Sequence, residues 1–308
     1  MALPRPIPKI KRIRQADSET VYLKTIKEPT ARKGEVPVLK FKIFDEYESF
    51  LTQAFSTRYG GTSVGYYEEM DLSFHETKLL NDLEATKETR EHTSQNFEII
   101  GRAIGIRPEQ MVYSRQTHTT NVRKVGKKDA GMGVIRPRDF TDTDGLITNE
   151  PGVCLVTSYA DCNPVFFVDP VKKAIGASHA GWRGTIGNIA KVTIEKMQEE
   201  YGTDPADLRV FIGPGICGNC YEVGHDVSDR FKEAYTPDEA ESIIEIKDET
   251  HDNLNLLKAN YLNCIHAGVS PDYIAVSDIC TMENPELLFS HRASKGKRGT
   301  LCGFLMLK

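Results

Sequence analysis

The apolar residues of the chain follow two different periods, which together predict both helices and strands. A helical period runs over residues 82–104. Leu83, Arg90, Phe97 and Ile104, three of them apolar, stand seven residues apart there, and Gly105 follows as a stop signal. The same period recurs over 185–201, 226–235 and 255–267. Short apolar runs bounded by polar or turn residues are typical of strands, and they occur at 21–26, 36–45, 51–56, 111–114, 145–148, 153–158, 164–169, 174–178, 208–212, 273–276 and 301–307.

The order of these elements predicts one domain. Strands and helices are interspersed over residues 36–308, with no internal repeat and no linker between them. We therefore expect a single α+β domain, in which a mixed β-sheet is flanked by helices. Residues 1–35 are rich in proline and basic side chains and contain one strand-like run, so we expect them to form a basic, weakly ordered N-terminal extension.

Charge is divided unequally along the chain. The net charge is −5, but residues 1–42 carry eleven Lys and Arg against four Asp and Glu, so the remainder is strongly acidic. A basic segment could contact nucleic acid or acidic lipid, but the acidic remainder argues against a nucleic-acid enzyme. No apolar run approaches the roughly 18 residues of a membrane span. We therefore expect neither nucleic acid nor a membrane as a partner.

The seven cysteines indicate a reducing compartment. The N-terminus lacks the apolar core of a secretory signal, and an odd number of cysteines in a chain of this length points to free thiols in the cytoplasm. Cys217 and Cys220 form a Cys-x-x-Cys pair, which could bind metal or cycle as a disulfide in a non-enzymatic module. No second pair follows at zinc-ribbon spacing, so a loop with two thiols is the simpler interpretation.

Three polar residues follow predicted strands directly: His118, Cys162 and His179. Side chains at strand ends can converge on one pocket. Two imidazoles and one thiolate suit a transition metal such as zinc, and three protein ligands would leave a fourth position open for water or substrate, as in catalytic sites. Spacings of 44 and 17 residues do not by themselves establish a site, because a core histidine or a buried thiol would explain each residue singly.

The neighbours of these residues favour a ligand pocket. His179 begins the segment His-Ala-Gly-Trp-Arg-Gly-Thr, which joins a strand to a helix and holds the only tryptophan of the chain. Trp182 and Arg183 there could form a platform for an anion or a ribose, or be a core residue and a surface charge. Asp161 precedes Cys162 and could either orient a metal ligand or cap a turn. His75 is a weaker candidate for the same pocket.

A series of motifs in one order resembles the laccase-domain family, whose members are described as purine nucleoside phosphorylases with adenosine deaminase activity. The match covers residues 36–308, and the His-Ala-Gly-Trp-Arg-Gly segment is its most distinctive part. The motifs are Ser56-Thr57-Arg58 before Gly60-Gly61, Gln116-Thr117-His118, Thr143-Asp144-Gly145, Ala160-Asp161-Cys162-Asn163-Pro164, His179 to Gly184, Ile212-Gly213-Pro214 and Tyr221-Glu222-Val223.

The resemblance implies a site, a cofactor and substrates. It implies that His118, Cys162 and His179 are the metal ligands and the centre of the active site, with zinc or copper as the ion. It further implies that Arg58 lines the substrate pocket, where it could meet phosphate, and that purine nucleosides and phosphate are the substrates. The implied fold is of the YfiH-like α+β type, also likened to certain cysteine-dependent toxins. Thr119 and His291 depart from the glycine and tyrosine common in relatives, which bears on the shape of the pocket.

Two other activities compete with this interpretation. A cysteine hydrolase would use Cys162 as nucleophile and His179 as base, for example in editing of cell-wall precursors. A polyphenol oxidase would use copper, but a multicopper enzyme needs two histidine-rich centres. The chain has eight histidines and no His-x-His pair, so a single copper ion is the most that this alternative allows.

Overall fold

The structure is a computed structural model that describes residues 18–74 and 83–308. Residues 1–17 of the expected basic extension, and His75, lie outside the described residues.

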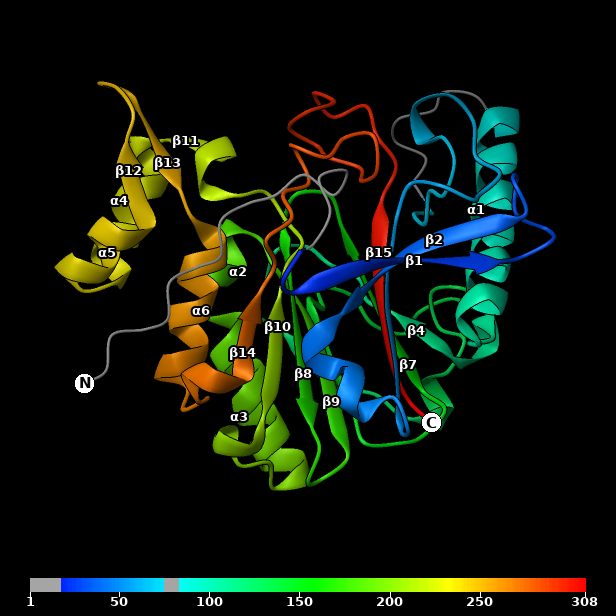
Figure 1. Cartoon of the computed structure of the whole chain (residues 1–308), viewed down its shortest axis with the longest axis horizontal. Helices are drawn as coiled ribbons and strands as arrows, with labels where there is room; N and C mark the ends of the chain where they lie inside the picture. Colours follow the sequence, from blue (N-terminus) through cyan, green and yellow to red (C-terminus); the bar gives the residue numbers. More distant parts are fainter. Residues whose placement is uncertain (1–17, 75–82) are drawn as a thin grey trace.

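Two six-stranded sheets make up most of the fold (Figure 1). The first has the order β1-β2-β3-β15-β7-β4, with bounds Val21–Lys27, Glu35–Phe41, Leu51–Ser56, Leu301–Leu307, Cys154–Tyr159 and Met111–Tyr113. The second has the order β14-β10-β8-β9-β6-β5, with bounds Ile274–Val276, Arg209–Ile212, Asn163–Asp169, Ala174–Ala180, Gly145–Thr148 and Val122–Lys124. Both sheets are mixed, because β4 runs parallel to β7 in the first, and β14 and β5 run parallel to their neighbours in the second.

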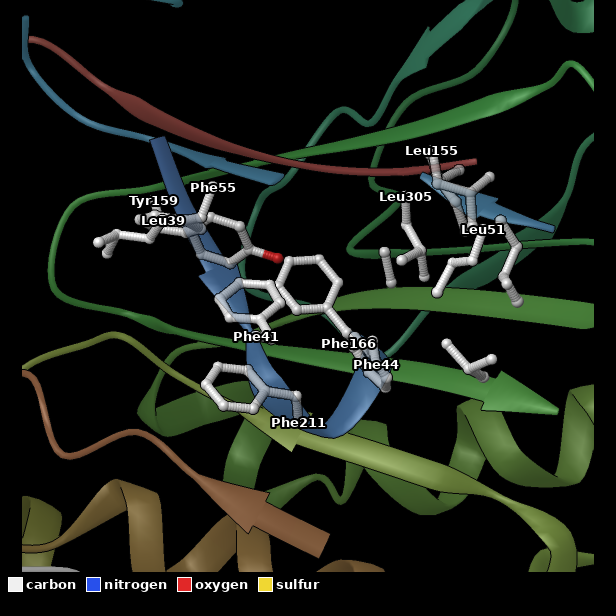
Figure 2. Packing of buried hydrophobic residues seen from close by; sticks show 14 of the residues in the cluster. Leu39, Phe41, Phe44, Leu51, Phe55, Leu155, Tyr159, Phe166, Phe211 and Leu305 are labelled. Atoms are coloured by element: carbon white, nitrogen blue, oxygen red, sulfur yellow. The ribbon is translucent and has the colours of Figure 1, made fainter. Parts of the chain in front are cut away.

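The two large sheets pack face to face around aromatic side chains. Phe41 of β2 stacks on Phe211 of β10, with ring centroids 4.1 Å apart, and on Phe166 of β8, at 5.4 Å. Figure 2 shows these rings in one cluster with Phe55 and Tyr159. Because β2 belongs to the first sheet and β8 and β10 to the second, this cluster is the core of a sandwich.

Helices cover the outer faces of the sandwich. α1 (Leu83–Ile104) packs on the first sheet through buried residues that include Phe97 and Ile100, whereas α3 (Ile189–Tyr201) and α6 (Leu256–His266) cover the second. Figure 1 shows α1 and the pair α3–α6 on opposite sides of the molecule. The predicted single α+β domain is therefore confirmed, with two mixed sheets where one was expected. In the described part of the chain, no helix has the length and apolarity needed to cross a membrane.

The helix expected over 185–201 is two helices. α2 (Trp182–Ile186) ends before Gly187, and α3 begins after Asn188. Asn188 has a left-handed backbone conformation (φ 58°), and its side chain accepts a hydrogen bond from the N–H of Lys191. Asparagine tolerates this conformation and caps helix starts, so it begins a new helix here instead of continuing the first.

The N-terminal part of the described chain belongs to the packed structure. β1 pairs with β2 along all of its seven residues, and the hydroxyls of Ser18 and Thr20 bond to the carboxylate of Asp278. Within residues 18–35, which we expected in a weakly ordered extension, β1 therefore forms the edge strand of the first sheet. The pairing satisfies backbone groups that β2 would otherwise leave open at this edge.

A third, small sheet follows the second along the chain. Its order is β11-β13-β12, with bounds Glu222–Gly224, His251–Leu254 and Ile244–Ile246, and it packs with α4 (His225–Ala234) and α5 (Pro237–Ile243). The apolar pattern predicts α4 but neither these three strands nor α5. The strands have three or four residues each, too few to show a period.

Gly303 of β15 lies where the two large sheets come close together. A methyl group at this position would lie 2.3 Å from the Cζ atom of Phe166 in the opposite sheet. We therefore expect Gly303→Ala to lower the free energy of unfolding by about 1–3 kcal/mol, as measured by urea denaturation. The double variant Gly303→Ala/Phe166→Leu should recover part of this loss, since the smaller side chain makes room. Strictly additive effects of the two changes would contradict this explanation.

Candidate active site

Strand pairing in the second sheet brings Cys162 to His179. β8 and β9 are antiparallel, and Pro164 near the start of β8 is paired with His179 near the end of β9. Cys162 lies in the turn just before β8, so its side chain is held beside the end of β9. The two residues are seventeen positions apart in sequence, and the register of this strand pair is what brings them together. A shift of one residue in that register would turn one of the side chains to the other face of the sheet.

His118 reaches the same place through the carboxylate of Asp144. Asp144 is fully buried at the start of β6, the other neighbour of β9. It accepts hydrogen bonds from the backbone N–H groups of Thr117, His118 and Thr119 at 2.9–3.0 Å, and from the hydroxyl of Thr119 at 2.9 Å. These bonds hold His118 in a left-handed backbone conformation (φ 66°), which directs the loop toward His179.

Asp144 also orients His179. The Nδ1 of His179 is hydrogen-bonded to Oδ1 of Asp144 at 2.8 Å, which leaves Nε2 as the ring nitrogen free for other chemistry. Burial would raise the pKa of Asp144, but the hydrogen bonds from His179 and from the backbone of Thr117 lower it to about 2. The carboxylate is therefore ionised and keeps a proton on Nδ1.

The three candidate ligands lie within reach of one ion. One donor atom from each of His118, Cys162 and His179 lies within 4.8 Å of the others, and Sγ of Cys162 is 3.9 Å from Nε2 of His118. Donors bound to one zinc ion at its usual bond lengths are about 3.5 Å apart. A methyl group on Gly181 would lie 2.8 Å from the ring of His118 and 3.1 Å from Sγ of Cys162, so glycine keeps the space beside the donors open. The residues present fit a zinc-type ion.

Cys162 and His179 form a strongly polarised pair. Burial would raise the pKa of the Cys162 thiol, but His179 and His118 lower it. Burial would lower the pKa of His179, but the sulfur of Cys162 and the carboxylate of Asp144 raise it. The sulfur therefore carries negative charge near neutral pH, as required of both a metal ligand and a nucleophile.

A cavity of about 620 Å³ opens beside these donors. Tyr159, Trp182 and Tyr221 supply aromatic surface to its lining. Its guanidinium groups come from Arg183, Arg292 and Arg298. Its other lining residues include Ser73, Gln116, Ser158, Ile216, Leu256, His291 and Thr300. The cavity thus combines flat apolar surfaces with positive charge, and has room for a small organic anion and a ring system.

Arg58 lies elsewhere, contrary to the expectation that it lines the pocket. Its guanidinium donates to the carbonyl oxygens of Glu68 and Pro285 and lies over the ring of Phe289. It is not among the residues that line the cavity. The polar contacts of Arg58 join two loops, so its guanidinium is engaged within the protein.

Asp161 lines the cavity but does not orient a ligand. Its carboxylate accepts hydrogen bonds from the hydroxyl of Thr281 at 2.6 Å and from the N–H of Arg292 at 2.7 Å. The orienting role considered for Asp161 in the sequence is performed by Asp144 for His179. Trp182 and Arg183 do line the cavity, and Cζ of Arg183 lies over the Trp182 ring, 4.2 Å from its centroid.

Asp144 and Arg298 are only weak candidates in the sequence, the first as half of a possible carboxylate pair with Asp142 and the second for a conceivable phosphate contact, and nothing in the sequence singles out Arg292. Asp144 stood within the Thr-Asp-Gly motif of the family resemblance, which was a usable signal. Arg298 belongs to a short basic cluster with Lys295 and Lys297, a pattern that usually means solvated surface. The spacing of these residues in the sequence does not indicate which basic side chain of the cluster faces the cavity.

Relatives of known name or structure match most of the chain. The family described as multi-copper polyphenol oxidoreductase laccase matches residues 52–308. A Bacillus subtilis protein named purine nucleoside phosphorylase YlmD is 33% identical over 255 residues, which are 82% of this chain and 87% of that protein. A Bacteroides thetaiotaomicron protein named purine nucleoside phosphorylase is 33% identical over 280 residues, 88% of this chain and 99% of that protein. The crystal structure of the Bacillus licheniformis hypothetical protein YfiH has a TM-score of 0.80 at 30% identity, covering 88% of this chain and 96% of that chain.

Proposed function

Because the chain belongs to the multi-copper polyphenol oxidoreductase laccase family, and relatives that are 33% identical over the aligned residues are named purine nucleoside phosphorylases, we propose that it is a purine nucleoside phosphorylase. It would convert adenosine, inosine, guanosine or methylthioadenosine, with phosphate, into the free base and the sugar 1-phosphate. One observation carries the proposal: a single cavity joins the His118–Cys162–His179 group to aromatic surfaces and to guanidinium groups.

Each wall of the cavity suits one part of these substrates. Trp182 and Tyr221 offer flat surfaces on which a purine can stack. Both Nη atoms of Arg292 donate to the carbonyl oxygen of Glu222. In Arg298, Nη1 donates to the carbonyl oxygen of Gly299 and to the hydroxyl of Thr300, and the buried Nε has no hydrogen-bond partner among the residues that the structure describes. Arg298 and Arg183 are therefore the groups that we assign to phosphate, which arginine recognises through charge-assisted hydrogen bonds.

Phosphorolysis requires the residues of the cavity to position both the phosphate and the base. An oxygen of phosphate bonds to the anomeric carbon while the bond from that carbon to the purine nitrogen breaks, and the bonding electrons leave with the base. The sugar becomes cation-like in the transition state, as in glycoside hydrolysis. Arg183 and Arg298 would hold the phosphate close to that carbon, and the aromatic wall would hold the base in line with it.

His118, Cys162 and His179 would hold the metal ion, for which we propose zinc, with copper as the alternative at the same ligands. When bound, the ion would supply Lewis-acid polarisation of a group in the cavity. Asp144 would keep His179 in the tautomer whose Nε2 faces the ion, and would hold His118 through its backbone.

We propose adenosine deamination as a second activity of the same cavity. It is supported by the family resemblance and by the position of the His118–Cys162–His179 group in the cavity wall, where a purine and a water molecule can meet it. The water oxygen would bond to the amino-bearing carbon of the base, and the bond from that carbon to the amino nitrogen would break. One proton of the water would pass to the leaving nitrogen, which departs as ammonia, and the other to a ring nitrogen of the base. Inosine formed from adenosine without phosphate is the product that tests this activity.

The contacts of His179 also favour a second candidate function. Asp144, His179 and Cys162 lie in series, with Nδ1 of His179 on the carboxylate and the sulfur polarised by the same ring. This is the arrangement of a cysteine hydrolase, in which Cys162 would be the nucleophile, His179 the base, and Asp144 the carboxylate that orients the base. Metal content discriminates between the two, because a hydrolase would keep full activity after the ion at these ligands is removed.

A panel of nucleosides tests the proposed function most directly. We expect free base to be released from inosine, guanosine or adenosine only when phosphate is present, with sugar 1-phosphate formed in equal amount, as measured by chromatography. Base release without phosphate would indicate hydrolysis instead. No turnover of any nucleoside in the panel, by metal-loaded protein, would contradict the proposal.

Arg298→Gln should weaken phosphate binding selectively. Loss of one charge-assisted hydrogen bond of about 1.5–3 kcal/mol predicts a roughly 10- to 100-fold rise in the KM for phosphate, with a smaller change in the KM for the nucleoside. Lys295→Gln removes a nearby exposed charge that does not line the cavity and is the matched control. Equal effects of both changes would mean that phosphate responds only to the overall positive electrostatic potential and not to a direct contact with Arg298.

A further inference from the structure

Three cysteine thiols outside the candidate active site lie close together. The sulfur atoms of Cys217, Cys220 and Cys280 all lie within 4.8 Å of one another. Cys217 and Cys280 are buried, whereas Cys220 is partly exposed. The first two stand on one loop, which includes the short helix Gly218–Cys220, and the third lies sixty residues further along the chain. The Cys-x-x-Cys pair of the sequence is therefore part of a larger group.

Polar contacts around these sulfurs supply one hydrogen-bond donor and one further candidate ligand. The backbone N–H of Cys217 donates to Sγ of Cys280 at 3.3 Å. The thiol of Cys220 donates to Oε1 of Glu283 at 3.6 Å. An N–H donor stabilises a charged sulfur, and a carboxylate is an accepted ligand of zinc beside thiolates. A bound cation would take the place of the thiol proton between Cys220 and Glu283.

We propose that Cys217, Cys220 and Cys280 bind a second metal ion of the zinc class, with Glu283 as the fourth ligand. Sulfurs bound to one zinc ion are about 3.8 Å apart, so the observed group needs only a small contraction. Three sulfur donors select a thiophilic cation over magnesium or calcium. Four protein ligands leave no open position, so this ion would be structural, and the partly exposed Cys220 gives it a path of entry.

This ion would brace one wall of the candidate cavity. Ile216, next to the first cysteine, lines the cavity, and its N–H donates to the carbonyl oxygen of Asp161 at 2.8 Å. Thr281, next to the third cysteine, donates its hydroxyl to the carboxylate of Asp161 at 2.6 Å. Since Asp161 directly precedes Cys162, the two loops that the ion would join meet at the backbone that presents the active-site thiol.

Metal binding in the Cys162→Ser background isolates the second site, because it removes the thiolate of the first. The chain is stripped with a chelator under reducing conditions and titrated with cobalt(II), which absorbs strongly when thiolates bind it. We expect one ion per chain with a thiolate charge-transfer band, and loss of that band in Cys162→Ser/Cys220→Ser and in Cys162→Ser/Cys280→Ser. Cys264 is a buried thiol outside both groups, so Cys162→Ser/Cys264→Ser should bind as the parent does.

Thermal stability supplies an independent readout without any assay of turnover. Zinc should raise the melting temperature of the Cys162→Ser protein by about 5 °C or more. The double variant Cys162→Ser/Cys220→Ser should show no such shift. Absence of a thiolate–cobalt band in the folded parent would overturn the proposal. So would a band that persists in both double variants, or a disulfide between two of the three cysteines in the protein as purified, detected by mass spectrometry. None of these outcomes bears on whether the first site turns over nucleosides.

Discussion

Cys162→Ser is expected to lower nucleoside phosphorolysis by more than about 100-fold. The sulfur of Cys162 is one of three donors held within 4.8 Å of one another, and its negative charge depends on the adjacent His179. A serine hydroxyl keeps its proton near neutral pH and is a poor zinc ligand, so the ion would be lost or misplaced. The measurement is the initial rate with inosine and phosphate, together with the metal content of the same sample.

Two comparisons make this result specific. Cys264→Ser changes a buried thiol far along the chain from the site and should leave turnover unchanged. If Cys162→Ser loses turnover but keeps every ion of the wild type, the nucleophile of a cysteine hydrolase becomes the better assignment. Undiminished turnover in Cys162→Ser would refute the assignment of this residue to the active site.

Asp144→Asn is expected to damage both the site and the fold. The carboxylate accepts from three backbone N–H groups, one hydroxyl and His179, all in a fully buried position. An amide offers one oxygen in place of two, and its NH₂ group would face donors that need an acceptor. We expect a loss of about 2–4 kcal/mol in the free energy of unfolding and a fall of at least about 100-fold in kcat/KM.

Metal affinity separates a positioning role of Asp144 from a merely structural one. If Asp144 orients the ligands His118 and His179, Asp144→Asn should weaken zinc binding about 10- to 100-fold in competition with a chelator, at a temperature where the variant is folded. Asp142→Asn is the matched control, since this neighbouring carboxylate is exposed and accepts only from outer groups such as the hydroxyl of Thr117. Unchanged zinc affinity in Asp144→Asn would leave it a role in folding alone.

The apolar pattern predicts the main elements of the fold because that pattern is local. Strands such as β3 (Leu51–Ser56) and β15 (Leu301–Leu307), and the helix α1, have the bounds expected within a residue or two. The pattern does not predict the break at Asn188 or the three short strands of the small sheet. A two-residue break hardly disturbs a helical period, and strands of three or four residues are too short to establish one.

The number of sheets also depended on pairing that no local pattern contains. β15, the last strand of the chain, lies between β3 and β7 in the first sheet, and β14 lies at the edge of the second. Which apolar strand pairs with which is decided by how the aromatic residues around Phe41 and Phe211 fill the space between the sheets. Residues far apart along the chain meet there, so the sequence predicted a sheet but not that there would be two.

By itself, the sequence determined the fold class, the family and the three residues with the chemistry of a metal site, because residue type and motif order are written along the chain. The tertiary structure decided which side chains meet: it placed Asp144 under both histidines, Arg58 outside the cavity, Arg298 in its wall and Cys280 beside the Cys-x-x-Cys pair. Such meetings depend on strand register and on the closure of long loops. A shift of one residue in register turns a side chain to the opposite face, and no local spacing records that choice.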